Sequence, residues 1–308
     1  AKAVLGFFDK TASNLASDVF SSSRDAVVDC GYIVFRVEGA FAHEDAEIRQ
    51  AWENREATSG TSGFCIGKGE TDVLCKKHPA VRGVPNTMTL GAKLVSFNAE
   101  SSISYNRDFA PIGEDSAFKY TEALSYLLRD DRHRIYLGKM VLVFWANTED
   151  ESYCTTFMRL LAPAWDGTDD DFIRELKESA LPPDVDFFVL GLTGEITRIS
   201  VGLFVHDKYS QIVKNILYHH RRMEQPHSPS QPDYITIKLI LKAAGVRGEY
   251  PQPALIAATI RAILQGRPYP VLLQRQVQQN AMLPGNEVTY VDAAIIGACL
   301  YDKGFGQK

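Results

Sequence analysis

The amino-acid sequence predicts an α+β fold, in which a mixed α/β domain with largely antiparallel strands is followed by an all-α helical region. Short runs of β-branched and aromatic residues, each bounded by turn residues, recur through the first two thirds of the chain. Helical periods separated by proline- or glycine-bearing breaks fill the remainder. We therefore expect two domains, residues 1–206 and residues 207–308.

The first predicted elements lie near the N-terminus. Residues Val28 to Val37 are rich in β-formers and run into Glu38-Gly39, a pattern typical of a strand that enters a turn. The segment His43 to Arg55 carries Ile48 and Trp52 four positions apart, as on the apolar face of a short helix. Residues 1–8 resemble the middle of an amphipathic helix, so we expect the chain to begin inside a longer protein.

The remaining elements of the first domain follow from local patterns. Asp115 to Arg129 has the clearest helical stripe, and Gly138-Lys139 is the expected turn of a hairpin whose second strand is buried on both faces. In chain order we predict a loop at Thr58–Gly63, a hairpin turn at Gly67-Lys68-Gly69, a strand at Leu94–Phe97, the helix Asp115–Arg129, the hairpin strands Arg134–Leu137 and Met140–Trp145, and two strands within Val185–Val205 around a turn at Thr193-Gly194-Glu195.

The last part of the chain predicts five helices. Each fits a helical period, and breaks such as Gly245, Gly266 and Pro284-Gly285 separate them. The expected helices are Asp207–Arg222, Tyr234–Ala244, Gln252–Leu264, Pro270–Met282 and Val288–Leu300.

Charge, apolar runs and cysteine count limit the classes of function that fit this chain. The net charge is −5 with a pI near 5.8, which argues against a freestanding nucleic-acid binder, although a subunit within an assembly needs only a local basic groove. No apolar run approaches the roughly 18 residues that a membrane span needs. Five cysteines, an odd number, favour a reducing cytoplasm over a disulfide framework.

No catalytic or metal-binding constellation is predicted. Cys65, Cys75 and His78 match no closed zinc site, because their spacing leaves no fourth ligand nearby. Three consecutive acids, Asp169 to Asp171, cannot all face one metal site, and capping of the helix that follows explains them better. His133 and His206 have no partner at metal or triad spacing. We therefore expect no metal, no cofactor and no enzymatic activity.

A dense polar and aromatic segment is the main candidate for binding. Asn and Ser can hydrogen-bond base edges or phosphates, Tyr can stack on bases, and Lys and Arg supply positive charge. The alternative is a strand followed by a turn-rich loop, since Asn and Ser also favour turns. The candidate residues are Lys93, Ser96, Asn98, Tyr105, Asn106, Arg107 and Lys119.

Several blocks in one order resemble the Csd-type family, the large subunit of the type I-C CRISPR Cascade complex. Departures from the family pattern stand at Asn106, at Phe109 and at residues 195–197. The matching blocks are Cys65–Gly69, His78-Pro79, Arg82–Val84, Gly91–Asn98, Ser104-Tyr105, Ala110-Pro111, Ala117–Leu124, Val143–Ala146, Phe188–Leu192, Arg198–Val201 and Ala262–Pro270. By this resemblance the chain lacks the N-terminal part of such a subunit and the end of its helical region.

The resemblance implies a non-catalytic subunit of a crRNA-guided surveillance complex in the cytoplasm of a prokaryote. Such subunits recognise the PAM in the target duplex, stabilise the R-loop and recruit the helicase-nuclease that cuts. The implied partners are crRNA, target double-stranded DNA, the backbone, handle-binding and small Cascade subunits, and the helicase-nuclease, with no membrane. Arg198, Arg221 and Arg222 join the candidate contacts, although the last two also suit a solvated helix end. The alternatives are a metal-dependent nuclease and a purely architectural subunit.

Overall fold

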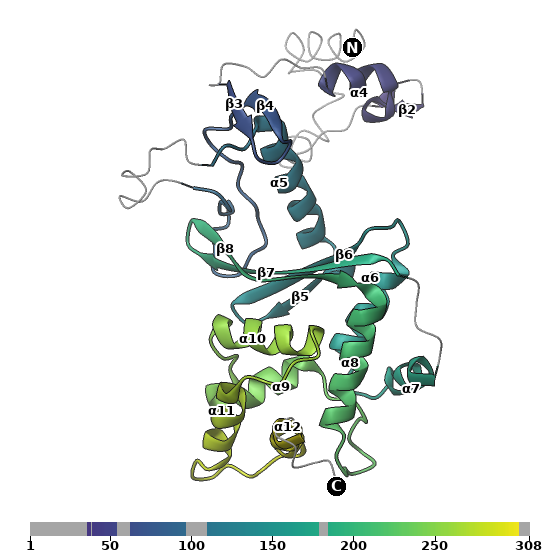
Figure 1. Ribbon diagram of the computed structural model, residues 1–308, viewed down its shortest axis with the longest axis vertical. Coiled ribbons are helices and arrows are strands. Elements are labelled where there is room, and N and C mark those ends of the chain that lie inside the picture. The colour runs from purple at the N-terminus through teal and green to yellow at the C-terminus, as the bar shows by residue number, and fades with distance from the viewer. Residues whose placement is uncertain (1–35, 38, 54–61, 97–109, 179–183, 302–308) are drawn as a thin grey trace, which may run out of the picture. The chain divides into compact units, whose positions relative to one another are not determined.

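We describe a computed structural model at residues 36–37, 39–53, 62–96, 110–178 and 184–301 (Figure 1). The chain divides into two compact units, residues 1–60 and 61–308, which are described separately. The fold is α+β, as the sequence predicts, with antiparallel sheets. None of the described helices is long and apolar enough to cross a membrane.

The first unit contains a small hairpin and a helix. Strands β1 (Arg36–Val37) and β2 (Ala40–Phe41) pair across a turn, and a short 3-10 helix (Ala42–Glu44) leads to α4 (Ala46–Glu53). The carboxylate of Asp45 accepts the first free N–H groups of α4, so the helix begins there and not at His43. The predicted helix is confirmed over Ala46–Glu53, with a later start than predicted, and Arg55 lies outside the described residues. Most of the strand predicted at 28–37, and the expected helix at 1–8, lie outside the described residues.

The second unit is built on a four-stranded antiparallel sheet in the order β5-β6-β7-β8. Its strands are β5 (Arg134–Leu137), β6 (Met140–Ala146), β7 (Asp186–Glu195) and β8 (Arg198–Lys208). The predicted β5–β6 hairpin is confirmed, with Gly138 at φ 62° in its turn. The turn predicted at Thr193–Glu195 is wrong, because pairing continues as far as Glu195 opposite Arg198 and the chain reverses at Ile196 and Thr197.

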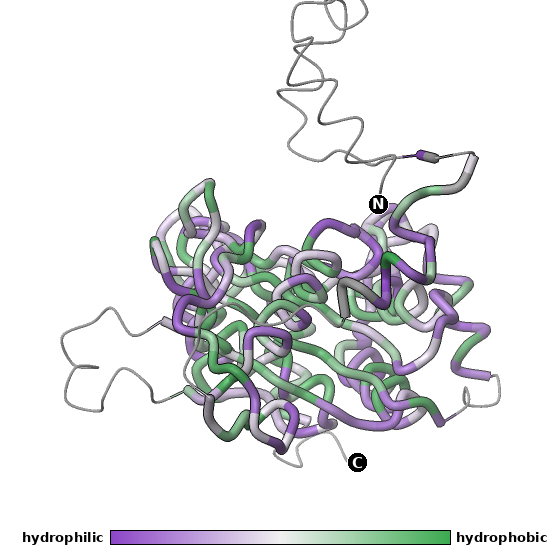
Figure 2. The backbone as a smooth tube through the Cα atoms, turned by 90° about the horizontal axis from the view of Figure 1, so that it is seen from above, coloured by the Kyte–Doolittle hydropathy of each residue, from purple (hydrophilic) through white to green (hydrophobic). Residues whose placement is uncertain are grey.

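Both faces of this sheet are covered. Alternate residues of β6 enter different clusters, so Leu142 belongs to the larger core and Val143 to the smaller one, and both are fully buried. Helices α6 (Ser152–Leu161), α8 (Tyr209–Met223) and α10 (Pro253–Leu264) lie on the larger side, and α5 (Glu114–Arg129) lies on the other (Figure 1). Hydrophobic segments run through the middle of this unit and hydrophilic ones lie around them (Figure 2). The sheet thus separates two cores.

The helices after β8 follow the predicted order. They are α8, then α9 (Ile237–Ala244), a 3-10 turn (Val246–Gly248), α10, α11 (Val271–Ala281) and α12 (Tyr290–Tyr301). Two further helices, α6 and α7 (Asp170–Glu178), come earlier in the chain, between β6 and β7. Helix α8 begins directly after β8, and side chains of the later helices share the larger core with the sheet. The predicted division into residues 1–206 and 207–308 stays a prediction.

A second, small hairpin precedes α5. Strands β3 (Ser62–Cys65) and β4 (Glu70–Val73) pair across the turn that contains Gly67-Lys68-Gly69, as predicted. The strand predicted at Leu94–Phe97 is wrong over its described part. Isolated bridges at Ala92 and Lys93 are followed by bends, because the backbone of Lys93 bonds to the tip of the β7–β8 hairpin and the chain then turns away.

Candidate nucleic-acid interface

Residues 74–96, the first described part of the connection between β4 and α5, contribute Val81, Val84 and Ala92 to the smaller core, and we call this segment the strap. Backbone hydrogen bonds hold it near its start and in its middle. Near its start, the amide of Cys75 donates to the carbonyl of Ile112 at 2.8 Å. In its middle, Val81 and Ala92 exchange two backbone hydrogen bonds of 2.8 and 2.9 Å. Val81 and Ala92 are also buried, so the strap packs as part of the fold.

The strap is docked on the tip of the β7–β8 hairpin. The amide of Met88 donates to the carbonyl of Ile196 at 2.9 Å. The amide of Lys93 donates to Thr197 at 3.0 Å, and the carbonyl of Lys93 accepts from Ile199 at 2.9 Å. These two bonds form a parallel bridge between Lys93 and Arg198. Two candidate cations from distant parts of the sequence therefore lie side by side.

The strap carries positive charge without negative charge. Its sequence contains four cations and no Asp or Glu, namely Lys76, Lys77, Arg82 and Lys93. Lys76, Lys77 and Arg82 are exposed, as is Arg198. Within the described part of the chain, none of these five cations forms an ion pair. Sequence reasoning singled out only Lys93 and Arg198, although an acid-free run with four cations was visible in the sequence.

The charge of Lys93 is also felt by a buried histidine. The Nδ1 atom of His78 lies 2.7 Å from the hydroxyl of Tyr120, which projects from α5. Burial lowers the pKa of His78, and the nearby ammonium of Lys93 lowers that pKa further. Burial likewise raises the pKa of the Tyr120 hydroxyl. His78 is therefore a neutral, buried residue of the strap and adds no charge to it.

Lys119 occupies a different electrostatic setting. Its ammonium lies 2.9 Å from Asp115, one turn earlier on α5. Asp115 also lies 3.3 Å from Lys68, which pairs with Asp72 at 2.9 Å. The hydrogen bond from Lys119 holds the pKa of Asp115 below its usual value. Lys119 is 71% exposed, but its charge is partly balanced, unlike that of Lys93.

The other candidate residues fall into three groups, within the strap, outside the described residues, and on α8. Ser96, at the end of the strap, is half-buried, whereas Asn98, Tyr105, Asn106 and Arg107 lie outside the described residues. Arg222 is 3% exposed, with its guanidinium 4.1 Å from the ring centre of Tyr269 and bonded to the carbonyl of Arg267. Arg221 is exposed on the same helix, α8, which packs on the opposite face of the sheet.

Asp169, Asp170 and Asp171, the three consecutive acids considered as a metal site, bind separate partners. Asp169 binds the guanidinium of Arg159 at 2.6 Å and accepts the amide of Ala164 at 3.0 Å. Asp170 accepts the amide of Asp233 at 3.0 Å, and Asp171 pairs with Arg174. Asp170 and Asp171 lie in the first turn of α7. No group of three or more His, Cys, Asp or Glu that could hold a metal occurs among the described residues.

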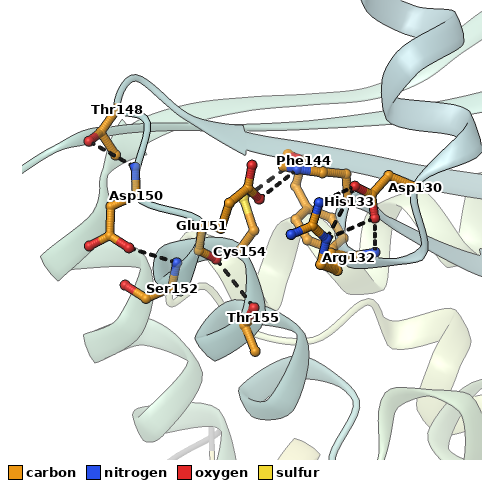
Figure 3. Close-up of polar contacts among 10 residues, drawn as sticks. All are labelled: Asp130, Arg132, His133, Phe144, Thr148, Asp150, Glu151, Ser152, Cys154 and Thr155. Atoms are coloured by element: carbon orange, nitrogen blue, oxygen red, sulfur yellow. Dashed lines mark hydrogen bonds and ion pairs between the residues drawn. The ribbon is translucent and has the colours of Figure 1, made fainter.

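Two histidines have acidic partners that their sequence positions did not reveal. The Nδ1 atom of His133 lies 3.0 Å from the carbonyl oxygen of Phe144, and its Nε2 lies 2.9 Å from Glu151 (Figure 3). His206 Nε2 lies 3.2 Å from Asp186. Beside His133, burial raises the pKa of the Cys154 thiol to about 11, so this sulfur stays protonated and is a poor nucleophile. The His133 pair joins the 3-10 helix that precedes β5 (Asp131–His133) to the N-cap of α6.

The comparisons with known proteins decide the family. The family model for CRISPR-associated protein (Cas_Csd1) matches residues 1–307. The chain belongs to the Cas_Csd1 family. The comparison with curated proteins finds no match. The resemblance noted in the sequence is therefore confirmed, and this Cas_Csd1 protein is a CRISPR-associated Cascade subunit.

Proposed function

We propose that this Cas_Csd1 chain is the non-catalytic large subunit of a type I-C Cascade and that its strap contacts the target duplex at the PAM. The observation that carries the proposal is the bridge between Lys93 and Arg198, which gathers cations from two segments that form no ion pair within the described part of the chain. Such cations hold phosphates and fix the position of a duplex.

The net charge of −5 is compatible with this role. In a crRNA-guided complex, base pairing between guide and target reads most of the sequence, so the protein needs to recognise only a short motif and the backbone shape. A local run of four cations without an acid supplies this attraction even on an acidic chain. R-loop stabilisation and recruitment of the helicase-nuclease belong to the same proposal.

The proposal of a non-catalytic subunit rests on how the polar side chains are used. The carboxylates of Asp169, Asp170 and Asp171 each serve a separate structural contact, so they do not converge on one substrate atom. His133 is held between a backbone carbonyl and Glu151. A nuclease would instead aim such groups at a common point.

The test uses the complex assembled with crRNA and a duplex that carries the PAM. The double variant Lys93→Ala/Arg198→Ala is expected to weaken duplex binding roughly tenfold to a hundredfold, if two charge-assisted contacts are lost. The dependence of log K on log salt should become shallower by roughly one for each phosphate contact removed. Lys238→Ala, an exposed cation on α9, is the matched control and should bind as the parent does.

Two results would contradict the proposal. Unchanged affinity and an unchanged salt slope in the double variant would remove the strap from the interface and leave an architectural subunit. Magnesium-dependent cutting by the complex without its helicase-nuclease, if abolished by Asp169→Asn, would instead establish a nuclease.

A further inference from the structure

Three aromatic rings form a ladder across the sheet. Trp145 on β6, Phe188 on β7 and His206 on β8 are direct cross-strand neighbours. The rings of Trp145 and Phe188 are 5.1 Å apart at 9°, and those of Phe188 and His206 are 4.4 Å apart at 7°. Near-parallel rings at these separations stack face to face, so the ladder presents ring edges across the sheet and an outer ring face at its end on β8, the edge strand.

The ladder is half-buried at Trp145 and Phe188 and exposed at His206. It lies on the face of the sheet that carries the smaller core, but α5 and the strap cover the part of that face around Val143 and Leu192. Beside the ladder, Phe204 is 54% exposed, and the side chain of His206 is 48% exposed. Exposed aromatic side chains that gather on one sheet face mark an interaction site more often than scattered ones do.

The rim of the ladder is acidic. The loop that leaves β6 after Trp145 starts with Asn147, whose amide donates to the carbonyl of Asp186 at 2.8 Å. This loop and the start of β7 carry five carboxylates, namely Glu149, Asp150, Glu151, Asp184 and Asp186. At this end of β8 Lys208 supplies positive charge, and its ammonium and the His206 ring both lie against Asp186, at 3.0 and 3.2 Å. Negative charge therefore prevails around the ladder.

The charge distinguishes between two occupants. Nucleobases stack on aromatic sheet faces, but the phosphates that accompany them need cations, and the acidic rim repels them. A guanidinium group stacks flat on an aromatic ring and also pairs with carboxylates. The exposed rings of His206 and Phe204 and the acidic rim thus match arginine side chains and oppose nucleic acid. The strap, by contrast, carries four cations and no acid, so its charge attracts nucleic acid.

We propose that the ladder face, Trp145, Phe188, Phe204 and His206, is a docking surface for a protein segment that presents arginine side chains, carried by another subunit of the complex. An arginine plane would stack on the outer ring of the ladder, His206, or on the exposed ring of Phe204, while the positive charge of the segment meets Glu149 and Asp150. This proposal uses the membership of a Cascade complex and is independent of the nucleic-acid role of the strap. The same subunit would then hold nucleic acid on one surface and protein on another.

Site-specific crosslinking in the assembled complex tests the docking surface. The photoreactive residue p-benzoylphenylalanine replaces Phe204, and mass spectrometry identifies the linked peptide after irradiation. The expected partner is a segment of another subunit that contains arginine. Replacement at Phe64, an exposed aromatic residue on β3, is the matched control and should not link to the same segment. Because Phe204 is half exposed, the replacement is compatible with the fold, which an unchanged melting temperature would verify.

A charge variant tests the acidic rim. Glu149→Lys in the Phe204-labelled chain should lower the crosslink yield at least threefold, and Glu149→Gln should lower it less. Crosslinks to crRNA, to DNA, to residues 1–60 of this chain or to a second copy would overturn the proposal. So would the absence of a link when the Phe64 control reacts, or a yield that Glu149→Lys leaves unchanged. Each of these results leaves the duplex-binding test of the strap unaffected, so the two proposals fail separately.

Discussion

The backbone of Lys93 pairs with that of Arg198 in a parallel bridge, with bonds of 3.0 and 2.9 Å to the residues on either side of Arg198. This contact joins the strap to the tip of the β7–β8 hairpin. It also sets two cations, neither of which is ion-paired to a described residue, next to each other on a chain that is acidic as a whole. The position of the strap should therefore control duplex binding.

Gly91 should be essential to that position. Its φ is 94°, and a Cβ atom there would lie 2.7 Å from the carbonyl oxygen of Val81. Gly91→Ala should displace the strap at its pair of backbone bonds, lower the melting temperature and weaken duplex binding by the complex. Gly69→Ala is the matched control, because Gly69 also has a positive φ, 75°, but has nothing within 4 Å of the added atom. That control should cost only about 1 kcal/mol of backbone strain. Equal effects of the two variants on duplex binding would argue against the strap.

Asp115 should reduce the attraction of Lys68 and Lys119 for the phosphates of the duplex. The variant Asp115→Asn removes the carboxylate that Lys68 and Lys119 share, which leaves more positive charge at the start of α5. Duplex binding by the complex should become tighter by a few-fold and more salt-dependent. By contrast, Lys119→Ala should weaken binding less than Lys93→Ala, because Lys119 is already paired. A larger loss for Lys119→Ala, measured in the same binding assay, would reverse this ranking of the two lysines.

The adjacent arginines on α8 should differ in stability, not in binding. Arg222 is buried against the rings of Tyr218 and Tyr269, so Arg222→Ala removes packing and cation–π contacts. The free energy of unfolding should fall by roughly 2–4 kcal/mol. Arg221→Ala, at an exposed position, should change it by less than about 0.5 kcal/mol. Urea unfolding of the two variants checks this, and similar losses would contradict the burial of Arg222.

Acid should destabilise the fold through His219 and His220. Burial lowers the pKa of His220 to about 4 and that of His219 well below its usual value. The unfolded chain binds protons near pH 6.5, above the folded pKa, so stability is lost as the pH falls from about 6.5 towards 4. For His220 alone, the loss between pH 7 and pH 5 is roughly 2 kcal/mol.

Urea unfolding at the two pH values measures this loss. His220→Gln should reduce the difference between pH 7 and pH 5, whereas His43→Ala, at an exposed position, should leave it unchanged. A pH dependence that His220→Gln leaves intact would show that other groups cause the loss.

Local sequence patterns determined most of the elements of this protein. The helical stripe of residues 115–129, the β5–β6 hairpin and the order of the later helices were all predicted, because each depends on periodicity and turn residues close in the chain. The ends of elements were less accurate, as at α4, where Asp45 caps the helix. The family also followed from ordered blocks of sequence.

Only the tertiary structure decided which of the candidate residues act together. Sequence position treats Arg198, Arg221 and Arg222 alike, whereas the sheet places Arg198 beside Lys93 and buries Arg222 in the opposite core. Likewise, the acidic partners of His133 and His206 come from other strands or helices. Pairing between distant segments depends on packing across the whole sheet, and no local pattern encodes it.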